Sequence, residues 1–436
     1  MPLMGRGGWV PLLLAGVLAA PLGAQTVLTA DDAVKTAVEK NLSLQRSSWD
    51  LDAKKRQADN AWGVFLPSTS LGAGLSRGNE ATGALGAKAE PSWLYSQSAG
   101  LSLSISPSIW ASLDTVKLNY RSGQLTYDLA RKSLEKNVRL AYASLLLERE
   151  NLKLAEENIQ RKEKNLADTR VKARAGLAPD LDVLSAQVSV ETLKPSYQKL
   201  QAAFQNDLGQ LKVLLGLPLD QPLELVGSLE TAVEKTLDLS KLEKGTVSPS
   251  ERQAALNLEA TKLSLESQQA SSWLPTATLG WTYSPGVTLK DGAAWADSGT
   301  LTLRLSYSLD SFLPWTTSSE KLTQAQESVR NAESLQQETK TNSALTRQND
   351  LRQIQQAVQS LETQALNVAL AQRTYDLNLE AYQKGAKDLV SLQNSGGDLN
   401  QARYDLLAQR YSLISTVLNL EYELDVPFGT LFGGKQ

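Results

Sequence analysis

The sequence has no cysteine and no histidine among its 436 residues. Thiol nucleophiles, imidazole bases, disulfides and the usual zinc and haem ligands are therefore excluded. Aromatic residues make up only 6% of the chain, and a formal net charge of -3 gives no support to nucleic-acid binding. No nucleotide-binding loop is present. We therefore expect no enzyme, no catalytic residue, no cofactor and no metal site.

Long apolar runs are also missing after residue 25, so we expect no transmembrane helix in the mature chain. The one apolar stretch, from Trp9 to Ala20, follows Arg6 and precedes a run of small residues. This pattern is typical of a secretory signal peptide, here residues 1–24, and predicts that the mature chain leaves the cytoplasm. An uncleaved anchor is the alternative, although the stretch is short for a span of about 20 residues.

Two motifs recur in the same order along the chain. The segment 66–76 (LPSTSLGAGLS) returns 208 residues later as 274–284 (LPTATLGWTYS), and 176–184 (GLAPDLDVL) returns 209 residues later as 385–393 (GAKDLVSLQ). Such self-similarity indicates a duplicated unit. We predict two repeats of helix, hairpin, long helix and helix. The predicted ranges are a first repeat at 25–216 with its hairpin at 66–110, a linker at 217–247, a second repeat at 248–425 with its hairpin at 274–313, and a tail at 426–436.

Stretches without proline predict two very long helices, at 112–175 and 315–384. At 1.5 Å per residue they would measure roughly 96 and 105 Å, too long for a compact globule. The shorter helices expected at 29–62 and 180–215 would together match one long helix if they stacked end to end. Thr29 and Ser248 are the expected N-caps, and Pro195 should kink its helix.

The first long helix has apolar residues on two sides. One heptad row contains Val138, Leu145, Leu152, Ile159 and Leu166, and a second contains Leu140, Leu147 and Leu154. Two positions along a helix correspond to about 200° around it, so the rows lie on nearly opposite faces. This pattern predicts a neighbour on both flanks, as in a closed wall of coiled helices. A solvated bundle or filament fits the helices equally well.

Four segments near the Leu-Pro motifs alternate apolar with small polar residues, which indicates β-strands. They lie within 71–75, 101–106, 277–283 and 301–309. Each strand is expected to have roughly 9 to 11 residues, the length of a tilted membrane strand, but alternation alone also fits a soluble sheet. Seven of the eight tryptophans after the signal peptide fall at or between these strands, which favours the membrane. Trp62, Trp110, Trp273 and Trp315 would form an interfacial girdle. Arg304, on the polar face, would line the lumen.

Four strands cannot close a membrane barrel, because such barrels begin at about eight strands and an open edge in lipid leaves backbone groups unsatisfied. The barrel must therefore be shared between copies of the chain. Three copies would give twelve strands; from physical reasoning alone, two or four copies remain open.

In these features the sequence resembles the TolC-type outer-membrane factors, also called outer membrane efflux proteins. The resemblance rests on the LTADDA opening at 28–33, both Leu-Pro strand entries, and the motifs beginning at Gly176 and Gly385. It implies a mainly α fold with membrane β-strands: a homotrimer whose twelve-stranded barrel in outer-membrane lipid continues into a long, coiled periplasmic α-helical barrel. The linker at 217–247 would contribute to an equatorial belt.

The resemblance also implies a function. Such a trimer would be the exit duct of a tripartite efflux pump or a type I secretion system, working with a periplasmic adaptor and an inner-membrane transporter. A surface adhesin or structural envelope protein on the same scaffold is the alternative.

The turns at Gly176 and Gly385 would form the periplasmic tip, where the channel closes. Ser391 and Asn394 stand where the family's best-known member has pore-constricting aspartates. An acidic ring would then come from Asp180 and Asp182, or be absent, and Asp180 would equally fit the N-cap of the next helix.

Overall fold

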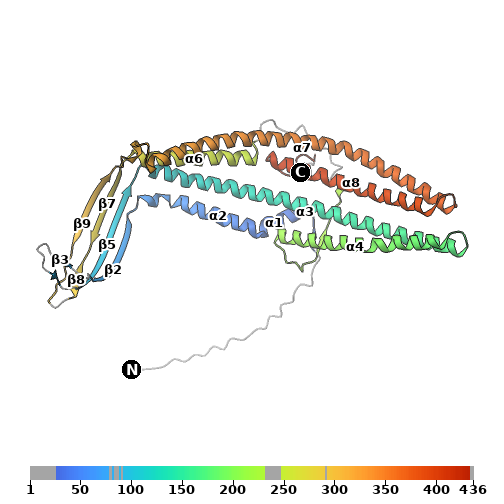
Figure 1. Cartoon of the computed structure of the whole chain (residues 1–436), viewed down its shortest axis with the longest axis horizontal. Coiled ribbons are helices and arrows are strands. Elements are labelled where there is room, and N and C mark those ends of the chain that lie inside the picture. Colours follow the sequence, from blue (N-terminus) through green and yellow to red (C-terminus); the bar gives the residue numbers. More distant parts are fainter. Residues whose placement is uncertain are drawn as a thin grey trace, which may run out of the picture.

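The computed structural model describes residues 26–77, 81–82, 88–89, 92–230, 247–289 and 292–432. The molecule is elongated, with a β-sheet at one end and long helices extending from it to two hairpin turns at the other end (Figure 1). Within the described ranges, no helix is both long enough and apolar enough to cross a membrane. The predicted signal peptide, part of the predicted linker and the last residues of the tail lie outside the described residues.

The same order of elements occurs twice along the chain, and the predicted mainly α fold with strands at one end is confirmed. The first series is α1 (Ala30–Lys40), α2 (Leu42–Asp59), β2 (Ser68–Arg77), β5 (Trp93–Ile105), α3 (Ser108–Arg174) and α4 (Asp180–Leu215). The second is α6 (Pro249–Trp273), β7 (Thr276–Tyr283), β8 (Gly286–Leu289), β9 (Gly299–Ser306), α7 (Thr317–Gln383) and α8 (Leu389–Glu423). Shorter elements are β1 (Thr26–Leu28), β3 (Ala81–Thr82), β4 (Lys88–Ala89), β6 (Leu223–Leu225) and the 3-10 turns η1 (Ala61–Phe65) and η3 (Asp310–Phe312).

The long helices α3 and α7 each contain 67 residues, about 100 Å of helix. Both predicted N-caps are confirmed. The Thr29 hydroxyl accepts a hydrogen bond from the Asp32 backbone N–H at 3.2 Å, and the Ser248 hydroxyl accepts one from the Glu251 N–H at 3.1 Å. Each cap satisfies a backbone donor that the first turn leaves without a helical partner.

The prediction of one continuous helix over 29–62 is wrong. Asn41, which is 7% exposed, has extended backbone geometry and separates α1 from α2. Its side-chain oxygen accepts from the N–H groups of Ser43 and Leu44 at 2.9 and 3.0 Å, and its amide donates to the Leu214 carbonyl at 2.8 Å. The break therefore lets one buried side chain cap α2 and bind the end of α4.

Gly216 lies on the α4 side of the same contact, the joint at which α1 and α4 meet. It has a φ of +69° and ends α4, and its N–H donates to the Val213 carbonyl at 3.1 Å. A Cβ atom at this position would lie 2.4 Å from the Lys40 carbonyl oxygen. Both the left-handed backbone and the close approach of α1 therefore require glycine.

The Gly216→Ala variant should be destabilised by roughly 1–3 kcal/mol, because alanine would adopt the strained left-handed region and clash with Lys40. Gly209→Ala is the matched control within α4, where an added Cβ meets no atom within 4 Å. The control should be stabilised by about 0.5–1 kcal/mol, since glycine is costly inside a helix. Chemical denaturation of both variants measures the difference, and equal stabilities would contradict this account of the joint.

The second series has a comparable joint built with charge. Asp425, which follows α8, has a φ of +56° without being glycine. Its carboxylate pairs with Lys132 of α3 and Arg252 of α6. The ion pairs hold the aspartate in the left-handed conformation and connect the end of α8 to two other helices.

The core runs along α3, which packs against α1, α2, α4, α6 and α8. In the first predicted heptad row, Val138 and Leu145 are 0% and 1% exposed. In the second row, Leu140 and Leu147 are only partly buried against the same core. The row that remains half-exposed in one chain is available to a further neighbour.

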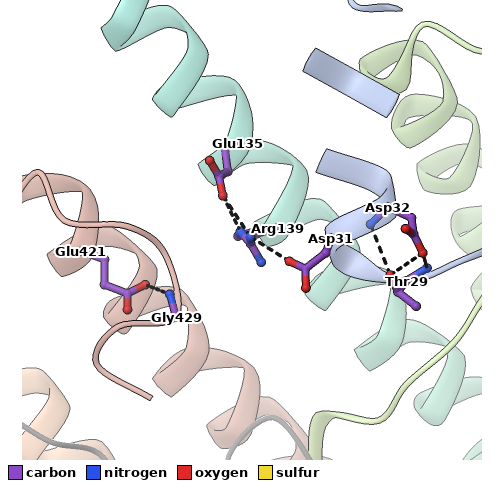
Figure 2. A network of polar contacts seen from close by, with 7 residues as sticks. All are labelled: Thr29, Asp31, Asp32, Glu135, Arg139, Glu421 and Gly429. Carbon is purple, nitrogen blue, oxygen red and sulfur yellow. Dashed lines mark hydrogen bonds and ion pairs between the residues drawn. The ribbon is translucent and has the colours of Figure 1, made fainter. Parts of the chain in front are cut away.

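Near the middle of the rod, polar contacts join the N-terminal end of the described chain to α3 and its C-terminal end to α8 (Figure 2). Arg139 of α3 pairs with Asp31 and with Glu135, both at 2.9 Å. Glu421 of α8, 0% exposed, accepts from the backbone N–H groups of Gly429 and Leu431 at 2.9 Å each. Burial raises the pKa of Glu421, and the two N–H groups oppose that rise.

Candidate pore surfaces and helix tips

The sheet is antiparallel, with its main strands in the order β2-β5-β7-β9. Strand β8 pairs with the outer part of β5, where it continues the line of β7 after Pro285. The register pairs apolar residues with apolar residues, and small or polar residues with one another. Leu101 opposes Trp281, Leu279 opposes Leu303, and on the other face Gly280 opposes Thr302. One face of the sheet is therefore mainly apolar and the other mainly small and polar.

The apolar face of the sheet is exposed to solvent in the single chain. Leu71, Leu301, Leu303 and Leu305 are 83%, 72%, 77% and 73% exposed. Leucines exposed to this degree on both outer strands of the sheet leave an apolar surface that water solvates poorly. The opposite face, carrying serine, threonine and glycine, cannot form the core of a soluble sandwich.

The outer strands β2 and β9 each have one strand neighbour in the described part of the chain. Because every adjacent pair in the four-strand order is antiparallel, β2 and β9 run in opposite directions. The β9 edge of one copy can therefore pair with the β2 edge of another and continue an antiparallel sheet. The described strands of one copy do not form a closed barrel.

The four predicted girdle tryptophans all lie where the sheet meets the helices. Trp62 is in η1, Trp110 lies in the first turn of α3, Trp273 ends α6, and Trp315 precedes α7. Their side chains are 59%, 67%, 41% and 79% exposed. Trp110 contacts Phe65 with ring centroids 5.7 Å apart, and Trp273 contacts Phe312 at 4.9 Å. Exposed indoles gathered at one level are typical of a membrane interface.

Both hairpin turns at the far end are closed by glycine in the left-handed conformation. Gly176 has a φ of +71° and Gly385 a φ of +75°. After Gly176, the Leu177 N–H donates to the Lys172 carbonyl at 2.8 Å; after Gly385, the Ala386 N–H donates to the Ala381 carbonyl at 2.8 Å. Each turn thus ends its long helix with the same hydrogen-bonded motif.

The structure places the predicted acidic residues differently from the capping interpretation. Pro179 occupies the N-cap of α4, so Asp180 is the first helical residue and does not cap it. Asp180 is exposed, and Asp182, two residues further along, is half-buried. Proline at the cap leaves no side-chain acceptor, whereas the carboxylates still face the positive end of the helix.

In the second turn the capping residue is Asp388, which sequence reasoning missed. Its carboxylate accepts from the Ser391 N–H at 2.8 Å, and this hydrogen bonding holds the pKa of Asp388 below its usual range. Of the two predicted tip residues, Ser391 is half-buried next to the Asp388 cap, whereas Asn394 is exposed further along α8. An aspartate immediately before the apolar residue that begins the helix was the available signal.

The two hairpins are joined above their turns through Tyr382. Its hydroxyl hydrogen bonds at 2.9 Å with that of Thr169, which is 0% exposed. The Lys172 ammonium donates to the Tyr382 carbonyl at 2.6 Å and lies 3.8 Å from the ring centroid. Further along, Arg403 of α8 pairs with Glu157 of α3 at 3.3 Å. None of these cross-hairpin partners was predicted, because no local motif marks them.

A carboxyl pair lies between α3 and α4. Glu148 Oε2 is buried and accepts no hydrogen bond from the described residues. Burial, followed by the Asp207 carboxylate, raises the pKa of Glu148 to about 7. A protonated Glu148 can donate to Asp207, whereas two ionised carboxylates would repel each other.

This pair should make stability depend on pH. The folded protein keeps a proton on Glu148 up to about pH 7, while the unfolded chain loses it near the ordinary pKa of 4.5, so stability falls as pH rises through that window. We expect Glu148→Gln to make this slope shallower and to melt higher than the natural protein at about pH 8. Thermal melts across the range measure it, and parallel curves for the two proteins would contradict it.

These surfaces define an elongated protein with a sheet that exposes an apolar face at one end and paired helix hairpins at the other. The family model for outer membrane efflux proteins matches residues 33–217. This match covers the first series of elements and agrees with the resemblance that the motifs predicted. No curated protein matches the sequence.

Solved outer membrane channels share the fold over nearly the whole chain. VceC of Vibrio cholerae is 15% identical, with a TM-score of 0.71 over 93% of this chain and 96% of that one. The Campylobacter jejuni channel CmeC is 15% identical, with a TM-score of 0.70 over 93% and 87%. The open state of the Neisseria gonorrhoeae channel MtrE is 17% identical, with a TM-score of 0.65 over 91% and 89%. The family match and the shared fold agree with the predicted place in the outer membrane, and neither supports the adhesin alternative.

Proposed function

We propose that the protein is a passive exit duct, assembled from three copies, that carries small toxic compounds or polypeptides out of the periplasm. One observation carries this proposal: the sheet is apolar on one face, polar on the other, and has two free edges of opposite direction. In lipid, every backbone group needs a partner, so such a sheet requires closure by further copies. Three copies give a barrel of twelve strands.

The helices would extend the duct into the periplasm. The two series of elements act as repeats, at 25–216 and 248–425, so three copies place six similar units around one axis. The half-exposed heptad row of α3 then belongs to the helical wall. The turns at Gly176 and Gly385 face the inner membrane, where a periplasmic adaptor and an inner-membrane transporter supply the energy that the duct lacks.

Planar-bilayer recording of the purified protein in detergent tests the proposal. We expect discrete channels together with a trimeric mass by light scattering. A protein that stays monomeric and produces no channels would overturn the shared barrel.

At the tip, Asp180 and Asp182 of the three copies would supply an acidic ring, in place of the neutral Ser391 and Asn394. Asp182→Ala should then weaken block of the channel by divalent cations, because the ring loses three charges. Asn394→Ala is the matched control and should leave block unchanged. Block of equal strength in the Asp182 variant would assign the carboxylate to the start of α4 alone.

A further inference from the structure

The polar face of the sheet contains a single charged residue. On β2, β5, β7 and β9, this face is built from serine, threonine and glycine, with Leu94 at its outer edge, and Arg304 of β9 is the exception. Arg304 is exposed and forms no ion pair with any described residue. A cation on such a neutral surface dominates the local electrostatic potential.

The register fixes where this charge lies. Arg304 opposes Thr278, and Thr278 opposes Ser104, so the three residues form one row across the sheet. The row lies close to the helix-proximal ends of its strands, since β9 ends at Ser306 and β5 at Ile105. Its neighbours are hydroxyl groups, which solvate the guanidinium without neutralising it.

A second arginine provides a contrast within the same sheet. Arg77 ends β2 on the apolar face, and its guanidinium lies 5.7 Å from the ring centroid of Trp93. This is a cation–π contact at the outer edge of the sheet. Two residues of the same charge thus stand on opposite faces.

We propose that Arg304 makes the barrel lumen select for anions and so favours cargo bearing carboxylate, phosphate or sulfonate groups. The inference rests on the proposed function, because rotational symmetry would bring one Arg304 from each of three copies to the same height. The three guanidinium groups form the only charged ring that the described strands contribute to the lumen. Anions are concentrated at this level and cations are repelled.

Screening gives this selectivity a specific salt dependence. The Debye length is about 30 Å at 0.01 M and about 3 Å at 1 M ionic strength. At low salt the field of each arginine extends across the lumen, whereas at high salt it reaches only the adjacent wall. Anion preference should therefore be strong at low salt and fade towards 1 M.

Reversal potentials under a KCl gradient test the proposal at about 0.01 M and about 1 M salt. We expect the natural channel to favour chloride at low salt. Arg304→Gln should shift the reversal potential toward potassium, Arg304→Glu should shift it further in the same direction, and Arg304→Lys should retain the chloride preference. All four proteins should converge at high salt.

Arg77→Gln is the matched control, because it removes the same charge from the opposite face of the sheet; it should leave the reversal potential unchanged. The inference is overturned if Arg304→Gln and the natural channel reverse at the same potential in low salt, or if Arg77→Gln shifts the potential equally. A protein that forms no channels would overturn the proposed function, and this inference with it.

Discussion

Replacing Leu303 with lysine should abolish assembly in the membrane. Leu303 lies near the middle of the apolar face of β9 and is 77% exposed in the single chain. A lysine at mid-bilayer depth on a barrel costs about 2–4 kcal/mol, and a trimer would incur this cost three times. We expect loss of the folded trimer band in semi-native electrophoresis and loss of channels in planar bilayers.

The neighbouring residue provides the control. Thr302 precedes Leu303 on the same strand, opposes Gly280, and belongs to the polar face. Thr302→Lys introduces the same charge where the lumen would hydrate it, so assembly should persist. Equal tolerance of lysine at both positions would show that neither face meets lipid.

Replacing Tyr382 with alanine should cost about 3–5 kcal/mol at the hairpin end of the rod, the range for truncating a large buried side chain. The ring is 7% exposed, packs beside Leu166 and Leu389, and bonds Thr169 through its hydroxyl. Its loss removes a buried contact between the two hairpins close to their turns. Hydrogen exchange should accelerate at both turns and remain unchanged in the sheet.

Two further variants separate packing from hydrogen bonding. Tyr382→Phe keeps the ring and removes only the hydroxyl, so it should cost about 1 kcal/mol. Leu377→Ala changes a 50% exposed residue on the same helix and should have little effect on exchange. Acceleration of the same size in Tyr382→Ala and Leu377→Ala would contradict the assignment of Tyr382 as the link.

The strands and long helices were predictable because their signals are local. Alternation of period two places Leu301 and Leu303 on one face regardless of the rest of the chain. The absence of proline allows α3 and α7 to run without interruption, and glycine at 176 and 385 marks the left-handed ends. Each of these features depends on backbone geometry within a few residues.

The break at Asn41 had a weaker local signal. Asparagine is a good N-cap, but it also occurs inside helices. What decides between the two is the Leu214 carbonyl, which accepts the Asn41 amide and is 173 residues away in the sequence. The same reasoning applies to Asp388, whose capping role depends on where the α7–α8 turn ends.

The sequence by itself determined the periodicities: two long rods, strands with one apolar face, and glycine-closed turns, because hydrophobic spacing and backbone preference act over short distances. Only the tertiary structure decided which distant groups meet. The Tyr382–Thr169 contact, the Glu148–Asp207 carboxyl pair and the row that places Arg304 beside Thr278 all join different elements. Such contacts depend on how rods and strands pack in three dimensions, and spacing along the chain does not encode them.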